Sequence, residues 1–294
     1  RRFKMESNFP EIGGKKIVAY FDFDTKHNPE LEIRVALSAV STEGALMNLK
    51  AETEGKTFAQ LASQASELWN RRLSQFEVEG TDSEKKMFYT SLYHTMINPS
   101  VYMDVDGSYR GLDNNIHKAE DFDNYSIFSL WDTYRAEHPL LNIIAPKENA
   151  GMVKSMIAHQ NQSVHKMLPV WSHMGNENWC MSGYHATSVL ADAVTKNVVK
   201  GTDNLLKAMV ETSEVEYYDN LKDYIGLGYI PFDKSATAAS STLENCYDDW
   251  TIYKTALNMN RMDIADVYYK RALTYRNIFD KSSGFVTPRT SDGN

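Results

Sequence analysis

Trp131, Asp132 and Arg135 lie close together in the segment YSIFSLWDTYRAEHPLL, residues 125–141. On a helix, Asp132 and Arg135 would share a face and could pair. An indole packs on the apolar C–H face of a sugar ring, and an ionised carboxylate accepts strong hydrogen bonds from hydroxyl groups. The cluster therefore fits a sugar-binding platform, in which Trp131 stacks and Asp132 accepts two hydroxyls. The alternative, which spacing alone favours, is a structural Asp–Arg pair under a core tryptophan.

A second carboxylate stands between two tryptophans in LPVWSHMGNENWCMSGYHA, residues 168–186. Glu177 follows Trp171 and precedes Trp179, and His185 lies near the end of the segment. A glutamate between two indoles fits a carbohydrate contact. A single glutamate is also commonly exposed or paired with a cation, so both interpretations stay open.

Two further acidic segments carry weaker signals. In TLENCYDDW, residues 242–250, Glu244 and Asp248 fall one helical turn apart. Like charges on one helix face repel unless a cation, a proton or a hydroxyl separates them, so they mark either a site or ordinary helix charge. The oxygen-rich loop 104–124 invites calcium, but its spacing does not match the EF-hand loop, and we interpret it as a solvated acidic loop.

Composition excludes several classes of protein. The chain has 294 residues with 31 Lys+Arg against 39 Asp+Glu, a net charge of −8. This acidic balance, without a basic block, argues against a nucleic-acid partner. No apolar run approaches the ~18 residues of a membrane span, and nucleotide-binding and zinc motifs are absent. Cys180 and Cys246 are too few for a disulfide scaffold, and their pairing stays open.

The predicted secondary structure changes along the chain from strands to helices. Alternating apolar residues predict strands at 16–24 and 31–40, joined by a turn at 27–30. From about residue 57 the spacing becomes helical. Two long polar and aromatic loops, 97–124 and 168–181, interrupt the helices. The predicted fold class is therefore α+β, mostly α. The expected helices are 57–74, 81–97, 125–137, 147–167, 182–198, 202–215, 240–258 and 261–280.

Taken together, these segments resemble glycoside hydrolase family 92, the calcium-dependent exo-acting α-mannosidases. The most specific piece is FSLWDTYRAEHPLL (128–141). The other matching pieces are YRGLD (109–113), LPVWSHMGNENWCMSGYHA (168–186), LGYIP (227–231), TLENCYDDW (242–250) and GFVTPR (284–289). They occur in the order and at the rough spacing expected of that family.

The resemblance implies a fold and a domain plan. The family joins a β-supersandwich to an (α/α)6 toroid. Residues 1–52 would be the C-terminal strands of the sandwich, 53–80 a linker helix and 81–294 the first part of a truncated toroid. The chain would then be a fragment that needs the rest of the parent polypeptide to fold well and to act.

The resemblance also implies a reaction, the release of terminal α-linked mannose from glycans with inversion, assisted by calcium as cofactor. Inversion needs an acid and a base, and the family's motifs for both are expected after Asn294, so no catalytic residue is assigned here. Asp132 would contact the mannose in the −1 subsite, positioned by Trp131 and Arg135. Glu177 and His185 would line or shape the pocket. The resemblance also implies that the enzyme is periplasmic or secreted.

Two alternatives remain. One is another (α/α)-toroid exo-glycosidase that uses Glu177 or Asp132 as its acid, and the other is a non-catalytic sugar-binding module. Replacing each carboxylate in the full-length protein separates them, because only loss of a general acid is rescued by an activated leaving group. Linkage specificity, calcium ligands and oligomeric state do not follow from the sequence.

Overall fold

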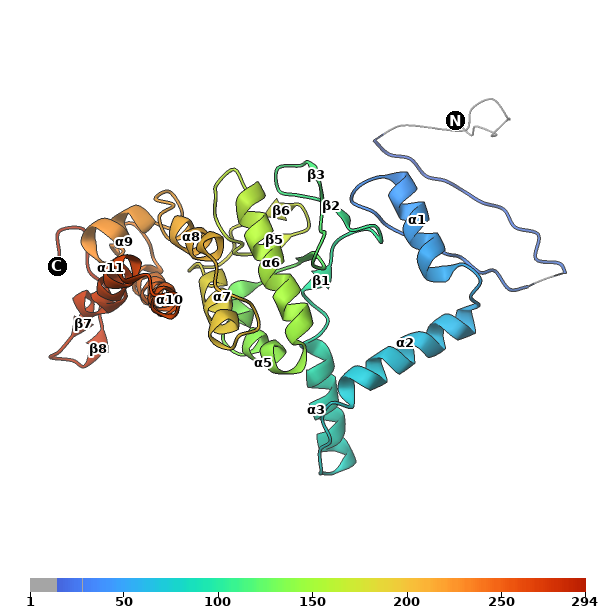
Figure 1. Ribbon diagram of the computed structural model, residues 1–294, viewed down its shortest axis with the longest axis horizontal. Helices are drawn as coiled ribbons and strands as arrows, with labels where there is room; N and C mark the ends of the chain where they lie inside the picture. The colour runs from blue at the N-terminus through green and yellow to red at the C-terminus, as the bar shows by residue number, and fades with distance from the viewer. Residues whose placement is uncertain (1–14, 28) are drawn as a thin grey trace. The chain divides into compact units, whose positions relative to one another are not determined.

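The computed structural model describes residues 15–27 and 29–294 (Figure 1). The chain divides into two units, Arg1–Val35 and Ala36–Asn294. The domain boundaries expected at 52 and 80 stay a prediction. No described helix combines the length and the apolarity that a membrane crossing needs.

The strands expected at 16–24 and 31–40 are wrong, because the described residues before Ser41 form no strand. Their apolar side chains face solvent, and Val18, Tyr20 and Leu37 are 69%, 88% and 84% exposed. An isolated pair of strands is marginal in water, since burial of an apolar face against further elements supplies its stability. Within the described residues this segment has no such neighbour in a sheet.

Three helices follow, and their starts are set by capping side chains. They are α1 (Thr42–Thr53), α2 (Phe58–Leu73) and α3 (Asp82–His94). Thr57 and Thr81 each form a capping box with a residue of the first turn, which satisfies free N–H groups there. The helices expected at 57–74 and 81–97 are confirmed. α1 was not expected, because it lies within the stretch assigned to strands.

The long loops contain short antiparallel strand pairs. β1 (Ser100–Val101) pairs with β4 (Tyr125–Ser126), and β2 (Ser108–Arg110) pairs with β3 (Ile116–Lys118). In the second loop β5 (Ser172–His173) pairs with β6 (Asn176–Glu177). Near the end of the chain β7 (Phe279–Asp280) pairs with β8 (Phe285–Val286).

The single helix expected at 125–137 is wrong. The backbone there forms β4, then α4 (Leu130–Thr133) and then α5 (Glu137–Ile144). Ile127 has φ 68°, a left-handed conformation that cannot continue a right-handed helix. The N–H groups of Phe128 and Leu130 instead bond to carbonyl groups of the 168–181 loop.

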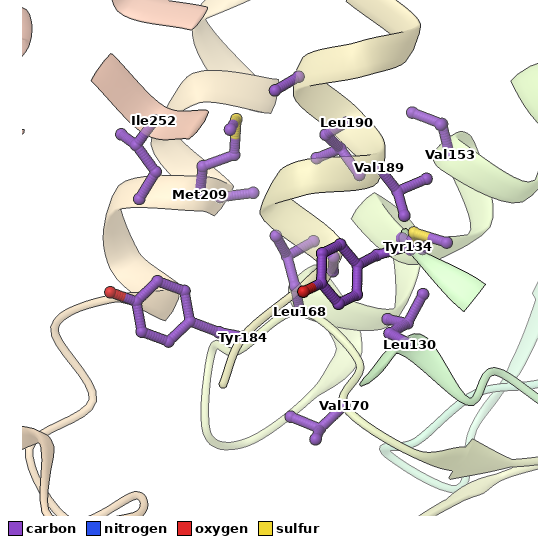
Figure 2. Packing of buried hydrophobic residues seen from close by; sticks show 14 of the residues in the cluster. Leu130, Tyr134, Val153, Leu168, Val170, Tyr184, Val189, Leu190, Met209 and Ile252 are labelled. Carbon is purple, nitrogen blue, oxygen red and sulfur yellow. The ribbon is translucent and has the colours of Figure 1, made fainter. Parts of the chain in front are cut away.

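The remaining helices form one hydrophobic core (Figure 2). α7 is buried on nearly every side, because α5, α6, α8 and α10 all pack against it. Leu190 of α7, Met209 of α8 and Ile252 of α10 meet in this core and are fully buried. Each such side chain contributes about 1.5–3 kcal/mol by burial. The helices are α6 (Pro146–Gln162), α7 (Ala186–Thr195), α8 (Asp203–Thr212), α9 (Leu221–Leu227), α10 (Ala238–Asn258) and α11 (Met262–Ala272).

The mostly α, α+β fold class is confirmed. Helices expected at 147–167, 182–198, 202–215 and 240–258 are present with shorter or shifted ends. The helix expected at 261–280 stops at Ala272 and passes through a 3-10 turn, Leu273–Asn277, into β7. The closed (α/α)6 toroid and the β-supersandwich stay predictions.

Candidate functional site

A backbone hydrogen bond and a buried side chain fix the position of the segment that carries Trp131 and Asp132. Phe128 N–H donates to the Ser172 carbonyl at 3.0 Å, and Leu130 is buried with 1% of its surface exposed. With Leu130 facing the core, the next two side chains of α4 face outward. Trp131 is 36% exposed and Asp132 is exposed. The tryptophan is therefore a surface platform rather than a core residue.

Asp132 keeps most of its hydrogen-bonding capacity free. Its Oδ2 accepts a hydrogen bond from the Ser129 hydroxyl, one turn earlier. An ionised carboxylate has about four acceptor positions, so a ligand can still be bound. In the described contacts Asp132 forms no ion pair with Arg135.

Arg135 lies instead over Tyr134, with its guanidinium carbon 5.0 Å from the ring centre. Its Nη2 donates to the Tyr134 hydroxyl at 2.6 Å. The expected helix-face pair between Asp132 and Arg135 is thus replaced by an Arg–Tyr contact. Arg135 remains exposed, and its other donors face solvent or a ligand.

Tyr134 joins this segment to the buried His185 at the start of α7. The two rings stack with centroids 4.1 Å apart and an interplanar angle of 11°. Figure 2 shows Tyr134 among the buried side chains of the core. His185 is 1% exposed, and its Nδ1 lies 2.9 Å from Asp248 Oδ1 of α10. The stack therefore couples the exposed platform to two core helices.

The environment of His185 favours its charged form. Burial lowers its pKa, but Asp248 and Glu244 outweigh burial, so the pKa is raised above the ordinary value. Its Nε2 points toward Glu244 Oε2 at 3.4 Å. A protonated imidazole donates from both nitrogens, which matches carboxylates on both sides of the ring.

Beneath this cluster, Asp249 holds the helices together. Its fully buried carboxylate accepts from the hydroxyls of Tyr184 and Tyr224, at 2.8 and 2.7 Å. Arg271 of α11 donates to the same carboxylate at 3.0 Å. All of its partners are protein groups in the core, so Asp249 supports the fold and does not face a ligand.

Glu177 is saturated by the backbone of its own loop. Its carboxylate accepts N–H groups of Val170, Trp171, Asn178 and Trp179, at 2.9–3.0 Å. The nearby His159 is buried, which lowers its pKa to about 3, so it is neutral and adds no ion pair. Glu177 thus shapes the 168–181 loop that anchors Leu130, and its side chain is only 7% exposed, so it is held by the loop rather than presented to a substrate.

Glu137 belongs to the site, although its type and spacing gave no signal. It begins α5, and its Oε1 is buried without a hydrogen-bond partner. Burial, together with the charge of Asp132, raises its pKa to about 7. Glu137 is therefore a partly protonated carboxyl group near neutral pH, close enough to Asp132 for the two charges to interact.

The structure places the five expected site residues as follows. Trp131, Asp132 and Arg135 share one exposed segment, and Tyr134 links that segment to His185. Glu177 lies in the loop behind them. Tyr134 was not recognised because it looks like an ordinary core tyrosine in the sequence. The one feature of the sequence that could have identified Tyr134 as a site residue is its position between Asp132 and Arg135.

No group of three or more His, Cys, Asp or Glu side chains within the described residues is arranged to hold a metal ion. In the acidic loop 104–124 some carboxylates bond to neighbouring groups. Asp106 accepts from Ser108, and Asp113 lies beside His117. Residues 15–27 and 29–294 therefore bring together no cluster of carboxylate and imidazole side chains that could enclose a calcium ion.

Comparison with known proteins identifies the chain's relatives. A family model described as the glycosyl hydrolase family 92 catalytic domain matches residues 44–294. Among solved structures, an α-mannosidase of this family from Bacteroides thetaiotaomicron, in complex with mannoimidazole, is 46% identical, with a TM-score of 0.84. An inverting mannosidase of the family from Bacteroides thetaiotaomicron VPI-5482 is 31% identical, with a TM-score of 0.81. No curated protein matches the sequence.

Each of these structures covers 87% of the chain, whereas the chain covers 34% and 36% of them. The chain thus spans about a third of the length of its solved relatives.

Proposed function

Because the chain belongs to glycosyl hydrolase family 92, we propose that the whole protein releases terminal α-linked mannose from glycans with inversion at the anomeric carbon. Two observations support the substrate and the stereochemistry. The similar structures are α-mannosidases, and one of them is named as inverting. The exposed indole and carboxylate of α4 have the chemistry of a sugar platform.

The free carboxylate of Asp132 beside the half-exposed Trp131 is the observation that carries the proposal. In this site Trp131 packs on the C–H face of the mannosyl ring and Asp132 accepts hydrogen bonds from its hydroxyls. Arg135 holds the segment through Tyr134. A hydrogen bond to a charged group contributes about 1.5–3 kcal/mol, so Asp132 supplies a substantial part of the binding energy.

Inversion requires a general acid at the leaving oxygen and a general base that activates water on the opposite face, with carboxyl groups about 6.5–9.5 Å apart. Glu177 cannot serve, because four backbone donors occupy it, and Asp248 and Asp249 are sealed from solvent. We assign the acid and the base to residues outside these 294. The platform then binds and orients the sugar while other groups move protons.

Calcium and an exported location complete the proposal. Calcium binds sugar hydroxyls and carboxylates as a hard cation. The described side chains do not form a cage for it, so we derive no step through the ion. Its ligands would come from outside these residues. A periplasmic or secreted location is supported by the family resemblance alone, and fractionation of cells tests it.

Steady-state kinetics of the full-length protein on an aryl α-mannoside test the proposal. We expect Asp132→Ala to lower kcat/KM by about 10- to 100-fold, the equivalent of one charged hydrogen bond. Asp266→Asn is a matched control, because Asp266 is exposed on α11. NMR of the first-formed sugar should show β-mannose. Absence of hydrolysis by the wild type, or α-mannose as the first product, would contradict the proposal.

A further inference from the structure

Resting on the proposed function, we propose that Glu244 is a second substrate-binding carboxylate, which His185 and Asp248 hold beside the Trp131–Asp132 platform. Glu244 projects from α10, and the platform belongs to α4. The two are joined through Tyr134, whose ring lies on His185 and whose hydroxyl reaches toward Glu244 at 3.4 Å.

The contacts of Glu244 are few and long. Its Oε2 lies 3.4 Å from the Tyr134 hydroxyl and 3.4 Å from His185 Nε2. His185 Nε2 is fully buried and makes no hydrogen bond of good geometry. Catalytic and binding hydrogen bonds are often long in a free enzyme and shorten when substrate is bound. The carboxylate is therefore oriented but keeps free acceptor positions.

Access distinguishes Glu244 from the other carboxylates of this cluster. Its side chain is 18% exposed, whereas that of Asp248 is fully buried. Asp248 is occupied by the Tyr184 N–H at 2.7 Å and by His185 at 2.9 Å. Glu244 is thus accessible from solvent, whereas Asp248 is not.

Charged groups of both signs surround Glu244. The groups that face His185 are Asp248 and Glu244 of α10 and Arg135 beyond Tyr134. Arg135 and His185, whose pKa is raised above its ordinary value, lie on the same side as the two carboxylates, so groups of opposite charge face each other in the cluster. An uncharged ligand with several hydroxyls fits such a cluster, because Glu244 accepts and Arg135 donates. An anionic ligand would be opposed by Glu244.

Deoxy substrates test this contact in the full-length enzyme. The probes are aryl α-mannosides lacking the 2-, 3-, 4- or 6-hydroxyl, assayed with the wild type, Glu244→Gln and Glu244→Ala. Glu216→Gln is the control, because Glu216 is exposed elsewhere on the chain. We expect both variants to melt within a few degrees of the wild type and to lose 10-fold or more in kcat/KM on the complete substrate.

The decisive result is the pattern over the four probes. In the wild type each missing hydroxyl lowers kcat/KM. In Glu244→Ala one of these penalties should shrink to 3-fold or less, because the partner of that hydroxyl is gone. If all four penalties are unchanged in Glu244→Gln and Glu244→Ala while the wild type is active, Glu244 does not bind substrate. Inactivity of the wild type itself would overturn the proposed function and this inference with it.

Discussion

Three carboxylates near the candidate site differ in how many hydrogen bonds they already accept. Glu177 accepts four backbone N–H groups, Asp132 accepts one hydroxyl, and Glu244 has two long contacts. A carboxylate offers about four acceptor positions. The number still free separates a residue that shapes a loop from residues that bind a ligand.

Glu177→Gln should lower the stability of the protein and leave the chemical step intact. Glutamine has one oxygen in place of two, so at least one buried N–H loses its acceptor, at a cost of about 1–3 kcal/mol. Urea unfolding of the full-length protein measures this loss.

The alternative assignment of Glu177 as a general acid gives a different pattern. It predicts a collapse of kcat at unchanged stability, with rescue by an activated leaving group. That pattern would show that the hydrogen bonds of the loop do not define the role of Glu177.

Glu137 should make stability depend on pH near neutrality. Burial and Asp132 raise the pKa of Glu137 in the folded state to about 7, above the ordinary glutamate value of 4.5. Between these values the folded state holds a proton that the unfolded state releases, so stability falls as pH rises from about 4.5 to 7. Glu137→Gln removes this slope.

Unfolding at pH 4.5 and at pH 8 checks this prediction. The variant and the wild type should be equally stable at the lower pH. At pH 8 the variant should be more stable by about 1–2 kcal/mol, a value reduced for solvent screening of a partly exposed group. A wild type whose advantage over the variant grows with pH would contradict the assignment.

Among the elements, α1 is held against the loop 97–124 by hydrogen bonds to one buried carboxylate, that of Asp104. Asp104 accepts from the Ser38 hydroxyl at 2.7 Å and from the Asn48 amide at 2.8 Å. Gly44 lets the helix approach this closely, because a Cβ there would lie 2.3 Å from Asp104 Oδ2. The absence of a side chain is therefore required at this position.

Gly44→Ala should loosen α1, at a cost of about 1–3 kcal/mol for the forced shift. Hydrogen exchange of the α1 amides in the full-length protein measures the loss. Gly226→Ala in α9 is the control, because a Cβ there meets nothing within 4 Å and alanine favours a helix. Unchanged protection of α1 in Gly44→Ala would show that the close approach does not hold the helix.

Helices with regular apolar spacing and capping residues could be predicted from the sequence, as α2 and α3 show. The strands at 16–24 and 31–40 could not be judged, because their local pattern says nothing of whether a neighbouring sheet is present. The break at Ile127 depends on bonds to the distant loop 168–181. Local propensity does not register such bonds.

The candidate site could be predicted in part. Trp131 and Asp132 were recognised by type and spacing, and they lie exposed as a platform requires. The stack of Tyr134 on His185 could not be foreseen, because it joins elements far apart in the chain. The four backbone N–H groups that bind Glu177 could not be predicted either, because every residue type except proline carries such a donor.

At the scale of the whole molecule, calcium should be required for activity. We expect a chelator such as EGTA to lower turnover of an aryl α-mannoside by the full-length protein 10-fold or more, and added Ca²⁺ to restore it. The reason is that a hard cation binds vicinal hydroxyls and the oxygens around them. Full activity after exhaustive chelation would remove calcium from the proposal.

Calorimetric titration of the full-length protein with mannoimidazole measures whether the Trp131–Asp132 platform binds a mannosyl ring. We expect binding by the wild type and by the control Asp266→Asn. For Asp132→Ala and Trp131→Ala we expect Kd values at least 10-fold weaker, without loss of the folded state. Equal affinity of the wild type and both variants would show that the Trp131–Asp132 platform does not bind the sugar.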